Sequence, residues 1–213
     1  MMDKRDVAGV LLKINAVKFN VDEPFTYASG IRSPVYTDCR LLMSHPLERR
    51  QVVDALKSMI EDEIGVEQFD VVAGTASAGI PHAAWLSELF GKPMVYVRKK
   101  SKGHGLQKNI EGTVPEGRKV LLVEDLVSTG GSSMDAVRVL RDAGAVVEHV
   151  AAIFTYSLPR AEKLFHDNSI QLHPLTDFET ALAEAVNSGY MAEEQSSRAL
   201  GWKRDPEGWQ DKK

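Results

Sequence analysis

The sequence contains a single cysteine, Cys39, among its 213 residues. One thiol excludes an internal disulfide framework and is typical of a reducing compartment. Asp38 and Arg40 flank it, so the Cys/His spacing of a zinc site is absent too. No apolar run approaches the roughly 20 residues that a membrane helix needs. The N-terminal MMDKRDVAGV also lacks the apolar stretch of a signal peptide. We therefore expect a cytoplasmic protein without membrane contact.

The sequence also has no surplus of positive charge, since its formal net charge is −4. This balance does not favour binding to nucleic acid. Hydrophobic residues make up 43% and charged residues 26%, as in ordinary globular proteins, and the length suits one α/β domain. A P-loop motif is absent, and GHGLQK at Gly103–Lys108 lacks the third glycine of a dinucleotide fingerprint.

What the sequence does contain is an alternation of strands and helices. Apolar strands are predicted at Phe69–Ala73, Met94–Arg98, Lys119–Val123 and Val146–Tyr156. Helices are predicted at Asp3–Lys18, Leu47–Ile64, Ala78–Phe90, Ser132–Ala143, Ala161–Phe165 and Phe178–Val186. This alternation predicts a parallel sheet covered on both faces, with ligands at the carboxyl ends of its strands. Trp202 and Trp209 indicate that the polar tail docks on the rest of the chain.

Glu124 and Asp125 directly follow the apolar run Val120–Val123, and the small residues Ser128–Ser133 then lead into a predicted helix. Backbone N–H groups and the dipole at such a helix start favour an anion, which glycine lets the backbone approach closely. Alternatively, Asp125 or Ser128 merely caps the helix. Because side chains alternate along a strand, at least one carboxylate faces a covered side of the sheet and needs a cationic or hydroxyl partner.

This segment resembles the phosphoribosyl-diphosphate signature of the type I phosphoribosyltransferases. The resemblance implies that the acidic pair binds the ribose hydroxyls and that the following loop holds the 5′-phosphate. The implied contacts with phosphoribosyl diphosphate come from Glu124, Asp125, Leu126, Val127, Ser128, Thr129, Gly130, Gly131 and Ser132.

Basic residues crowd into an unusually long connection, Tyr96–Gly112. Such a run is commonly a solvated surface loop, but this one lies between strands whose ends face one cleft, and its glycines suit a lid. It resembles the catalytic loop of the orotate phosphoribosyltransferases, R-K-x-x-K-x-H-G, through Arg98, Lys99, Lys102 and His104. The resemblance implies that all four side chains bind the diphosphate. It also makes Arg98, Lys102 and His104 catalytic, with Lys102 the most rate-critical, and places the Mg²⁺ cofactor on the diphosphate rather than on the protein.

Another small-residue turn, Gly74–Pro81, follows the predicted strand Phe69–Ala73. Two explanations fit this turn equally well: close packing of the strand against the next helix, and binding of the diphosphate. The resemblance favours diphosphate binding. Many orotate-specific members carry lysines where this sequence has Ala28 and Ala78. Backbone N–H groups would therefore have to replace those side-chain contacts.

The stretch Phe25–Asp38 resembles, through S-G-x-x-S-P, the orotate-binding hood of the same family. The resemblance places Tyr36 beside the pyrimidine, whereas the alternative is that the aromatic residues only pack a small subdomain. Many relatives carry an orotate-binding arginine near Tyr156–Ser157, but Arg160 lies several residues later. We therefore expect orotate to contact Ser128, Tyr36 and main-chain donors.

These motifs predict a type I phosphoribosyltransferase fold, an α/β central parallel sheet flanked by helices with a small N-terminal hood subdomain. One domain would span residues 1–213, with hood elements at about 19–40, the core at 65–157 and a C-terminal helical extension at 158–213. The resemblance implies that the protein makes orotidine 5′-phosphate in de novo pyrimidine biosynthesis, as a homodimer whose basic loop is shared between subunits. Alternatives are a phosphoribosyltransferase for another base and a nucleic-acid-binding regulator with the same fold.

Overall fold

The computed structural model describes residues 2–27, 30–98, 109–114 and 116–209. Its centre is a six-stranded sheet with the order β10-β9-β8-β5-β6-β7, in which each pair is parallel except β6–β7. The strands are β5 (Val71–Thr75), β6 (Met94–Val97), β7 (Ile110–Glu111), β8 (Lys119–Val127), β9 (Val146–Thr155) and β10 (Gln171–Asp177). The predicted central parallel sheet is confirmed.

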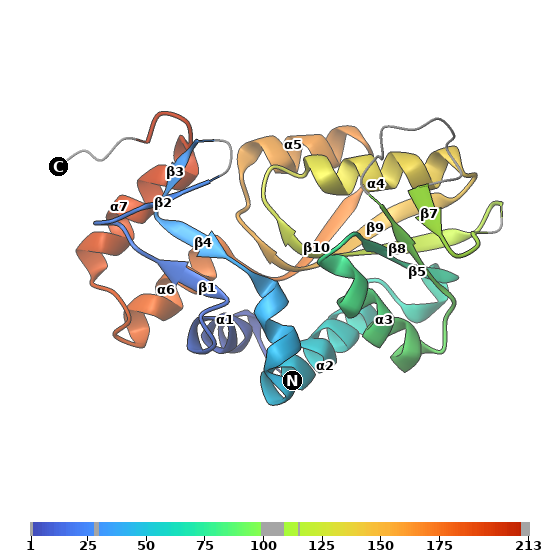
Figure 1. Cartoon of the computed structure of the whole chain (residues 1–213), viewed down its shortest axis with the longest axis horizontal. Helices are drawn as coiled ribbons and strands as arrows, with labels where there is room; N and C mark the ends of the chain where they lie inside the picture. The colour runs from blue at the N-terminus through green and yellow to red at the C-terminus, as the bar shows by residue number, and fades with distance from the viewer. Residues whose placement is uncertain (1, 28–29, 99–108, 115, 210–213) are drawn as a thin grey trace.

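Helices cover both faces of this sheet (Figure 1). One face carries α1 (Lys4–Lys13), α2 (Pro46–Glu63) and α3 (Gly79–Phe90), and the other carries α4 (Gly131–Asp142) and α5 (Pro159–Asp167). Along β8, Leu121 and Val123 belong to the core cluster beneath α1–α3, whereas Val120 and Leu122 belong to the cluster beneath α4 and α5. The strand is apolar throughout because alternate side chains enter two different cores.

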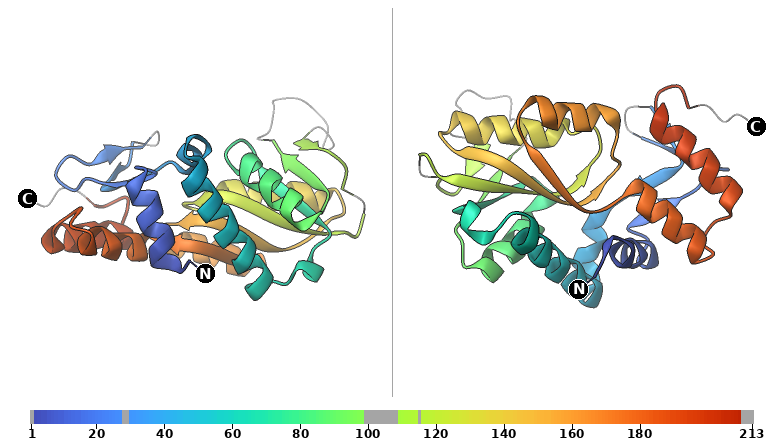
Figure 2. Two further views of the ribbon diagram at one scale, coloured as in Figure 1. Left: turned by 90° about the horizontal axis from the view of Figure 1, so that it is seen from below. Right: turned by 180° about the vertical axis from the view of Figure 1, so that it is seen from behind.

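The remaining elements form a smaller lobe at one end of the molecule (Figures 1 and 2). They are β1 (Val17–Phe19), β2 (Phe25–Thr26), β3 (Arg32–Ser33), β4 (Val35–Thr37), α6 (Phe178–Asn187) and α7 (Glu193–Arg204). β1 pairs with β4 and β2 with β3, both antiparallel. The 3₁₀ helix η1 (Cys39–Ser44) connects this lobe to α2. A second one, η2 (Val66–Gln68), connects α2 to β5.

Trp202 joins the two ends of the chain within the smaller lobe. Its side chain is 1% exposed, and its ring centroid lies 6.4 Å from that of Tyr27 and 5.5 Å from that of Tyr156. Its Nε1 donates to the Arg32 carbonyl oxygen at 3.1 Å. The prediction that the tail docks on the rest of the chain is therefore confirmed.

Local sequence signals set several helix ends. Asp3 forms a capping box with Asp6 at the start of α1, and Gly91 ends α3 in the left-handed conformation. The prediction that the first helix extends to Lys18 is wrong. The helix ends at Lys13 because residues from Val17 onward pair with β4 instead.

Strand ends depart further from the prediction. β8 extends to Val127 rather than Val123, because the acidic pair and the next two residues continue the pairing with β9. The sequence pattern indicated neither β10 nor α7. β10 contains Pro174 and lies at the edge of the sheet, where proline is tolerated, and α7 is polar with few buried positions.

Candidate active site

The candidate residues of the β8 segment lie at the carboxyl edge of the sheet, where β8 and β9 end. Residues 128–130 connect β8 to α4, and Tyr156 directly follows β9. The Tyr156 hydroxyl lies 3.1 Å from the Tyr27 hydroxyl, which in turn lies 2.8 Å from the Val35 carbonyl oxygen in β4. The smaller lobe therefore borders this edge of the sheet.

Glu124 faces the α4 side of the sheet. It is 4% exposed, and its Oε1 accepts a hydrogen bond from Ser133 Oγ at 2.8 Å. A carboxylate buried this deeply needs such a donor, since an unpaired buried charge is costly. The hydroxyl partner expected from the sequence is present, and it comes from the first turn of α4.

Asp125 faces the opposite side, where η1 packs against β8. Burial raises the pKa of its carboxyl group, while main-chain hydrogen bonds from Leu126 and Asp125 and the charge of Arg40 act in the other direction. The thiol of Cys39 lies on this side as well; burial raises its pKa, and the charge of Asp125 adds to the shift. A half-buried carboxylate near a guanidinium is suited to accept hydrogen bonds from ligand hydroxyls.

The loop after β8 ends at Gly130, whose φ of +79° lies in the left-handed region. A Cβ at this position would lie 2.9 Å from Phe165 Cε2, so both the backbone angle and the packing against α5 require glycine. α4 then begins without a side-chain cap, and Met134 N donates to the Gly130 carbonyl oxygen at 3.0 Å. The main-chain N–H groups of this first turn point out of the helix, where they can bind an anion.

The turn between β5 and α3 has a clear packing role. A Cβ on Gly79 would lie 2.5 Å from the Val123 carbonyl oxygen, and one on Gly74 would lie 3.0 Å from Ala83 Cβ. The glycines therefore allow α3 to lie directly on β5 and β8. Ala78 precedes α3 without giving a side-chain cap, so the start of this helix also presents main-chain N–H groups.

The long connection with many basic residues, Tyr96–Gly112, is called the basic segment, and it leaves β6 at Arg98. Its main-chain N–H donates to the Asn109 carbonyl oxygen at 2.7 Å, and its Nη1 lies 2.7 Å from Glu111 Oε1. The ends of the segment are thus held side by side next to β6 and β7. The other candidate residues, Lys99, Lys102 and His104, lie outside the described residues.

Comparison with known proteins identifies the family. A family model described as a phosphoribosyl transferase domain matches residues 42–184. The orotate phosphoribosyltransferase of Coxiella burnetii is 46% identical over 210 residues, which cover 99% of this chain and 100% of the relative. The orotate phosphoribosyltransferase of Listeria innocua is 46% identical over 98% of this chain and 99% of its own. The chain belongs to the orotate phosphoribosyltransferase family.

A solved structure of the orotate phosphoribosyltransferase family shares the fold. The crystal structure of orotate phosphoribosyltransferase from Aeropyrum pernix matches with a TM-score of 0.75 at 30% identity, over 87% of this chain and 99% of that one. The type I phosphoribosyltransferase fold predicted from the sequence is therefore confirmed.

Tyr36, the residue expected beside the pyrimidine, lies on β4 in the smaller lobe. Its side chain is 39% exposed, and its ring centroid lies 5.6 Å from that of Phe25. Tyr27, by contrast, is tied into the lobe by its hydroxyl and by Trp202. Of the aromatic residues in this stretch, Tyr27 is used for packing, while Tyr36 keeps an open face.

The remaining candidate residues of the β8 segment differ in accessibility. Val127 is 1% exposed and Leu126 packs against the core, so these two residues could contact a ligand only through their main-chain groups. Ser128 is half-buried, and Thr129, Gly131 and Ser132 are exposed around the start of α4.

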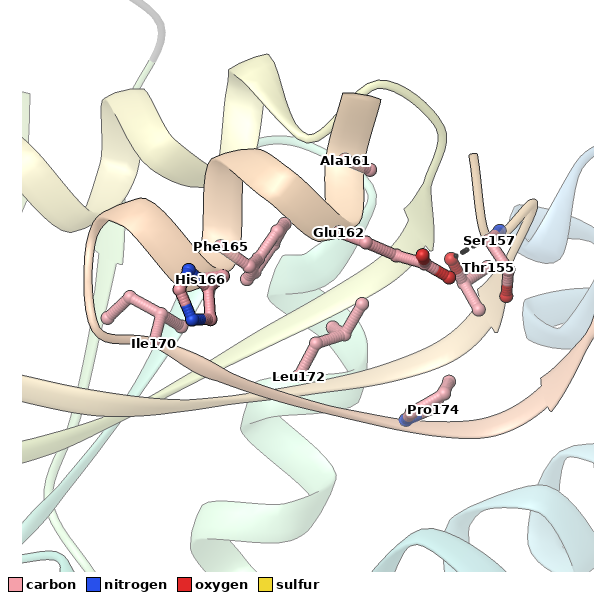
Figure 3. Close-up of a pocket in the computed structure, with 9 residues that line it drawn as sticks. All are labelled: Thr155, Ser157, Ala161, Glu162, Phe165, His166, Ile170, Leu172 and Pro174. Carbon is pink, nitrogen blue, oxygen red and sulfur yellow. Dashed lines mark hydrogen bonds between the residues drawn. The ribbon is translucent and has the colours of Figure 1, made fainter. Parts of the chain in front are cut away.

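A pocket lies between α5 and the strands β9 and β10 (Figure 3). It is lined by Thr155, Ser157, Ala161, Glu162, Phe165, His166, Ile170, Leu172 and Pro174. Phe165 belongs to its wall and also packs against Gly130. The acidic pair and residues 128–132 do not line it, so this pocket is separate from the candidate active site.

Two residues of the site were not predicted from the sequence. Ser133 falls within the helix predicted at Ser132–Ala143, and its position in the first turn of a helix beside a buried strand could have indicated a role. Arg40 lies far from Asp125 in sequence, and only the packing of η1 on β8 brings their charges together.

Among the described residues there is no cluster of three or more His, Cys, Asp or Glu side chains that could hold a metal ion. Within the same residues, no helix combines the length and apolar character needed to cross a membrane.

Proposed function

We propose that this chain transfers the 5-phosphoribosyl group from 5-phosphoribosyl 1-diphosphate to orotate, giving orotidine 5′-phosphate and diphosphate. The single observation that supports this best is the pairing of Glu124 and Asp125 with an uncapped helix start across Gly130. The identity of the substrates is inferred from the family to which the chain belongs. The enzyme would act in the cytoplasm, in pyrimidine biosynthesis.

The sugar phosphate would bind across the end of β8. The 5′-phosphate would lie at the first turn of α4, on the main-chain N–H groups of residues 128–132, where the helix dipole favours an anion. The carboxylates of Glu124 and Asp125 would accept hydrogen bonds from the ribose hydroxyls. Glu124 already holds the Ser133 hydroxyl at 2.8 Å, which keeps one of its oxygens oriented.

The leaving diphosphate would be neutralised from the basic segment. Arg98, Lys99, Lys102 and His104 would donate charge-assisted hydrogen bonds to its oxygens, and Lys102 would contribute most to the rate. Arg98 is held at the edge of the sheet by Glu111, 2.7 Å away. Mg²⁺ carried by the diphosphate would supply further charge neutralisation of the leaving group, with oxygen ligands from the substrate and water.

The acceptor would lie between the sheet and the smaller lobe. Tyr36 would contact the face of the pyrimidine, and Ser128 would donate or accept a hydrogen bond at its edge. The turn Gly74–Pro81 would add main-chain N–H groups to the diphosphate side of the site.

Spectrophotometric turnover of orotate with phosphoribosyl diphosphate and Mg²⁺ tests the proposed function. We expect conversion to orotidine 5′-phosphate, while uracil, hypoxanthine and adenine react far more slowly. Preferred turnover of another base by a folded preparation would assign a different acceptor. Binding to nucleic acid at moderate salt, without turnover, would point to a regulator.

We further propose a homodimer in which the basic segment of one subunit acts in the site of its partner. Mixing a Lys102→Ala chain with an Asp125→Asn chain tests this. If the segment is shared, one site of each mixed dimer regains both residues and activity partly returns. No recovery after subunit exchange, verified by a tagged subunit, would contradict sharing.

A further inference from the structure

Arg40, at the junction of β4 and η1, has an unusually well-fixed guanidinium. Its Nε donates to Asp38 Oδ1 at 2.6 Å and its Nη2 to Asp38 Oδ2 at 2.8 Å, while its main-chain N–H also donates to Asp38 Oδ1 at 3.1 Å. A bidentate pair of this kind restricts the orientation of a long side chain that is still 55% exposed. Among the described residues, its Nη1 has no hydrogen-bond partner.

Arg40 belongs to the segment that connects the two parts of the candidate site, since it lies in η1, which follows β4 and packs against β8. Hydrogen bonds to Asp38 raise the pKa of Arg40, and the negative charge of Asp125 contributes to the same shift. Arg40 is thus within electrostatic reach of Asp125, the proposed ribose-binding carboxylate, and it lies four residues after Tyr36 in the same β4–η1 segment. η1 holds it there by packing against β8.

The surface around Tyr36 is suited to an aromatic anion. Phe25 backs the ring at 5.6 Å, and 39% of the Tyr36 side chain remains exposed. Lys18 is the cross-strand partner of Tyr36 between β1 and β4, and its charge lowers the pKa of Asp38 after the contribution of Arg40. An exposed ring with Lys18 opposite it on the neighbouring strand, and with Asp38 already paired to Arg40, favours a planar ligand with a negative charge.

We propose that Arg40 binds the carboxylate of orotate and is the residue that makes this site prefer orotate to uncharged pyrimidines. This inference rests on the proposed function. The carboxylate of orotate is attached to the ring carbon next to N1, the atom that joins the ribose. It must therefore lie near the sugar, next to the end of β8, against which η1 packs. Asp38 acts as a positioning residue, because it orients the guanidinium without touching the substrate.

The test is Arg40→Gln, with steady-state kinetics in which orotate and phosphoribosyl diphosphate are varied separately. Loss of a charged hydrogen-bonding partner should raise KM for orotate roughly 10- to 100-fold, and KM for phosphoribosyl diphosphate should stay unchanged. The preference for orotate over uracil in kcat/KM should fall by a similar factor, because uracil has no carboxylate. Arg50→Gln is the matched control, since Arg50 pairs with Asp54 through Nε at 2.9 Å on the exposed side of α2.

Two more variants separate recognition from folding. Arg40→Lys keeps a cation and should retain part of the orotate preference, and Asp38→Asn keeps the guanidinium and should raise KM for orotate less than Arg40→Gln does. If Arg40→Gln instead changes both KM values equally, or leaves the orotate preference intact in a folded protein, the proposal is wrong and the arginine only pairs with Asp38. Absence of orotate turnover by the unaltered enzyme would reject the proposed function instead, independently of these variants.

Discussion

At the scale of single residues, the two carboxylates of the acidic pair meet different environments although they are neighbours in sequence. Glu124 is buried and accepts a hydrogen bond from Ser133. Asp125 faces η1 instead, where the positive charge of Arg40 acts on it. Because burial raises the pKa of Asp125 in the folded chain, its ionised form is less stable there than in the unfolded chain. At neutral pH this charge therefore subtracts from stability, and protonation as pH falls removes the penalty.

Neutralising the acidic pair should separate binding from stability. In a Glu124→Gln/Asp125→Asn protein the Kd for phosphoribosyl diphosphate should rise at least roughly 10-fold, since charged hydrogen bonds to the ribose are lost. Asp125→Asn alone should leave the melting temperature unchanged or higher. Calorimetric titration and differential scanning fluorimetry measure both effects, with Asp135→Asn on the exposed face of α4 as the control. Unchanged affinity in the folded double variant would contradict the ribose-binding role.

His82 of α3 predicts a pH dependence of stability. Its ring is fully buried, neither nitrogen has a hydrogen-bond partner among the described residues, and burial lowers its pKa from 6.5 to about 4. Below pH 6.5 the unfolded chain takes up a proton that the folded chain does not, so stability falls as pH decreases toward 4. From about pH 7.5 to about pH 5, this residue should remove about 2 kcal/mol of unfolding free energy.

Urea unfolding at both pH values measures this loss. His82→Leu should reduce the difference between them, whereas His166→Leu, an exposed position on α5, should not. An equal pH dependence in His82→Leu and the unaltered protein would assign the effect to other groups.

At the scale of elements, the junction of β8 and α4 depends on α5 as well. Gly130 combines a φ of +79° with contact to Phe165, whereas a Cβ on the next residue, Gly131, would have no neighbour within 4 Å. Gly130→Ala should therefore lower the free energy of unfolding by about 1–2 kcal/mol, while Gly131→Ala should change it little. Chemical denaturation of both variants checks this. Equal stability of the pair would mean that the loop relaxes around a left-handed alanine.

The elements also show where sequence patterns were sufficient. The alternating cores of β8, the cap at Asp3 and the stop at Gly91 all follow from local chemistry, and the structure has them. The length of β8 does not follow locally, because strand pairing with β9 keeps Glu124–Val127 extended even though carboxylates disfavour strands. The packing role of the turn Gly74–Pro81 follows from the 2.5 Å between a Cβ on Gly79 and the Val123 carbonyl oxygen, and its diphosphate-binding role stays a prediction.

At the scale of the whole molecule, Trp202 connects the C-terminal extension to the lobe that carries Tyr36. Trp202→Ala should lower the free energy of unfolding by about 3–5 kcal/mol, since a fully buried aromatic side chain is lost. Trp209→Ala is the control, because Trp209 is only half-buried and donates its N–H within its own segment, to Arg198. Circular dichroism during denaturation compares them, and losses of equal size would contradict a connecting role for Trp202.

The sequence by itself determined the sheet, the acidic pair, the glycine-containing turn after it and the family resemblance, because each is encoded by neighbouring residues with a fixed periodicity or turn chemistry. Only the tertiary structure decided that Glu124 pairs with Ser133, that η1 brings the charge of Arg40 toward Asp125, and that α7 packs on the smaller lobe. These contacts join segments far apart in the chain. They depend on how the helices pack on the sheet and on which charged side chains meet at the buried end of a strand. Local sequence patterns encode neither.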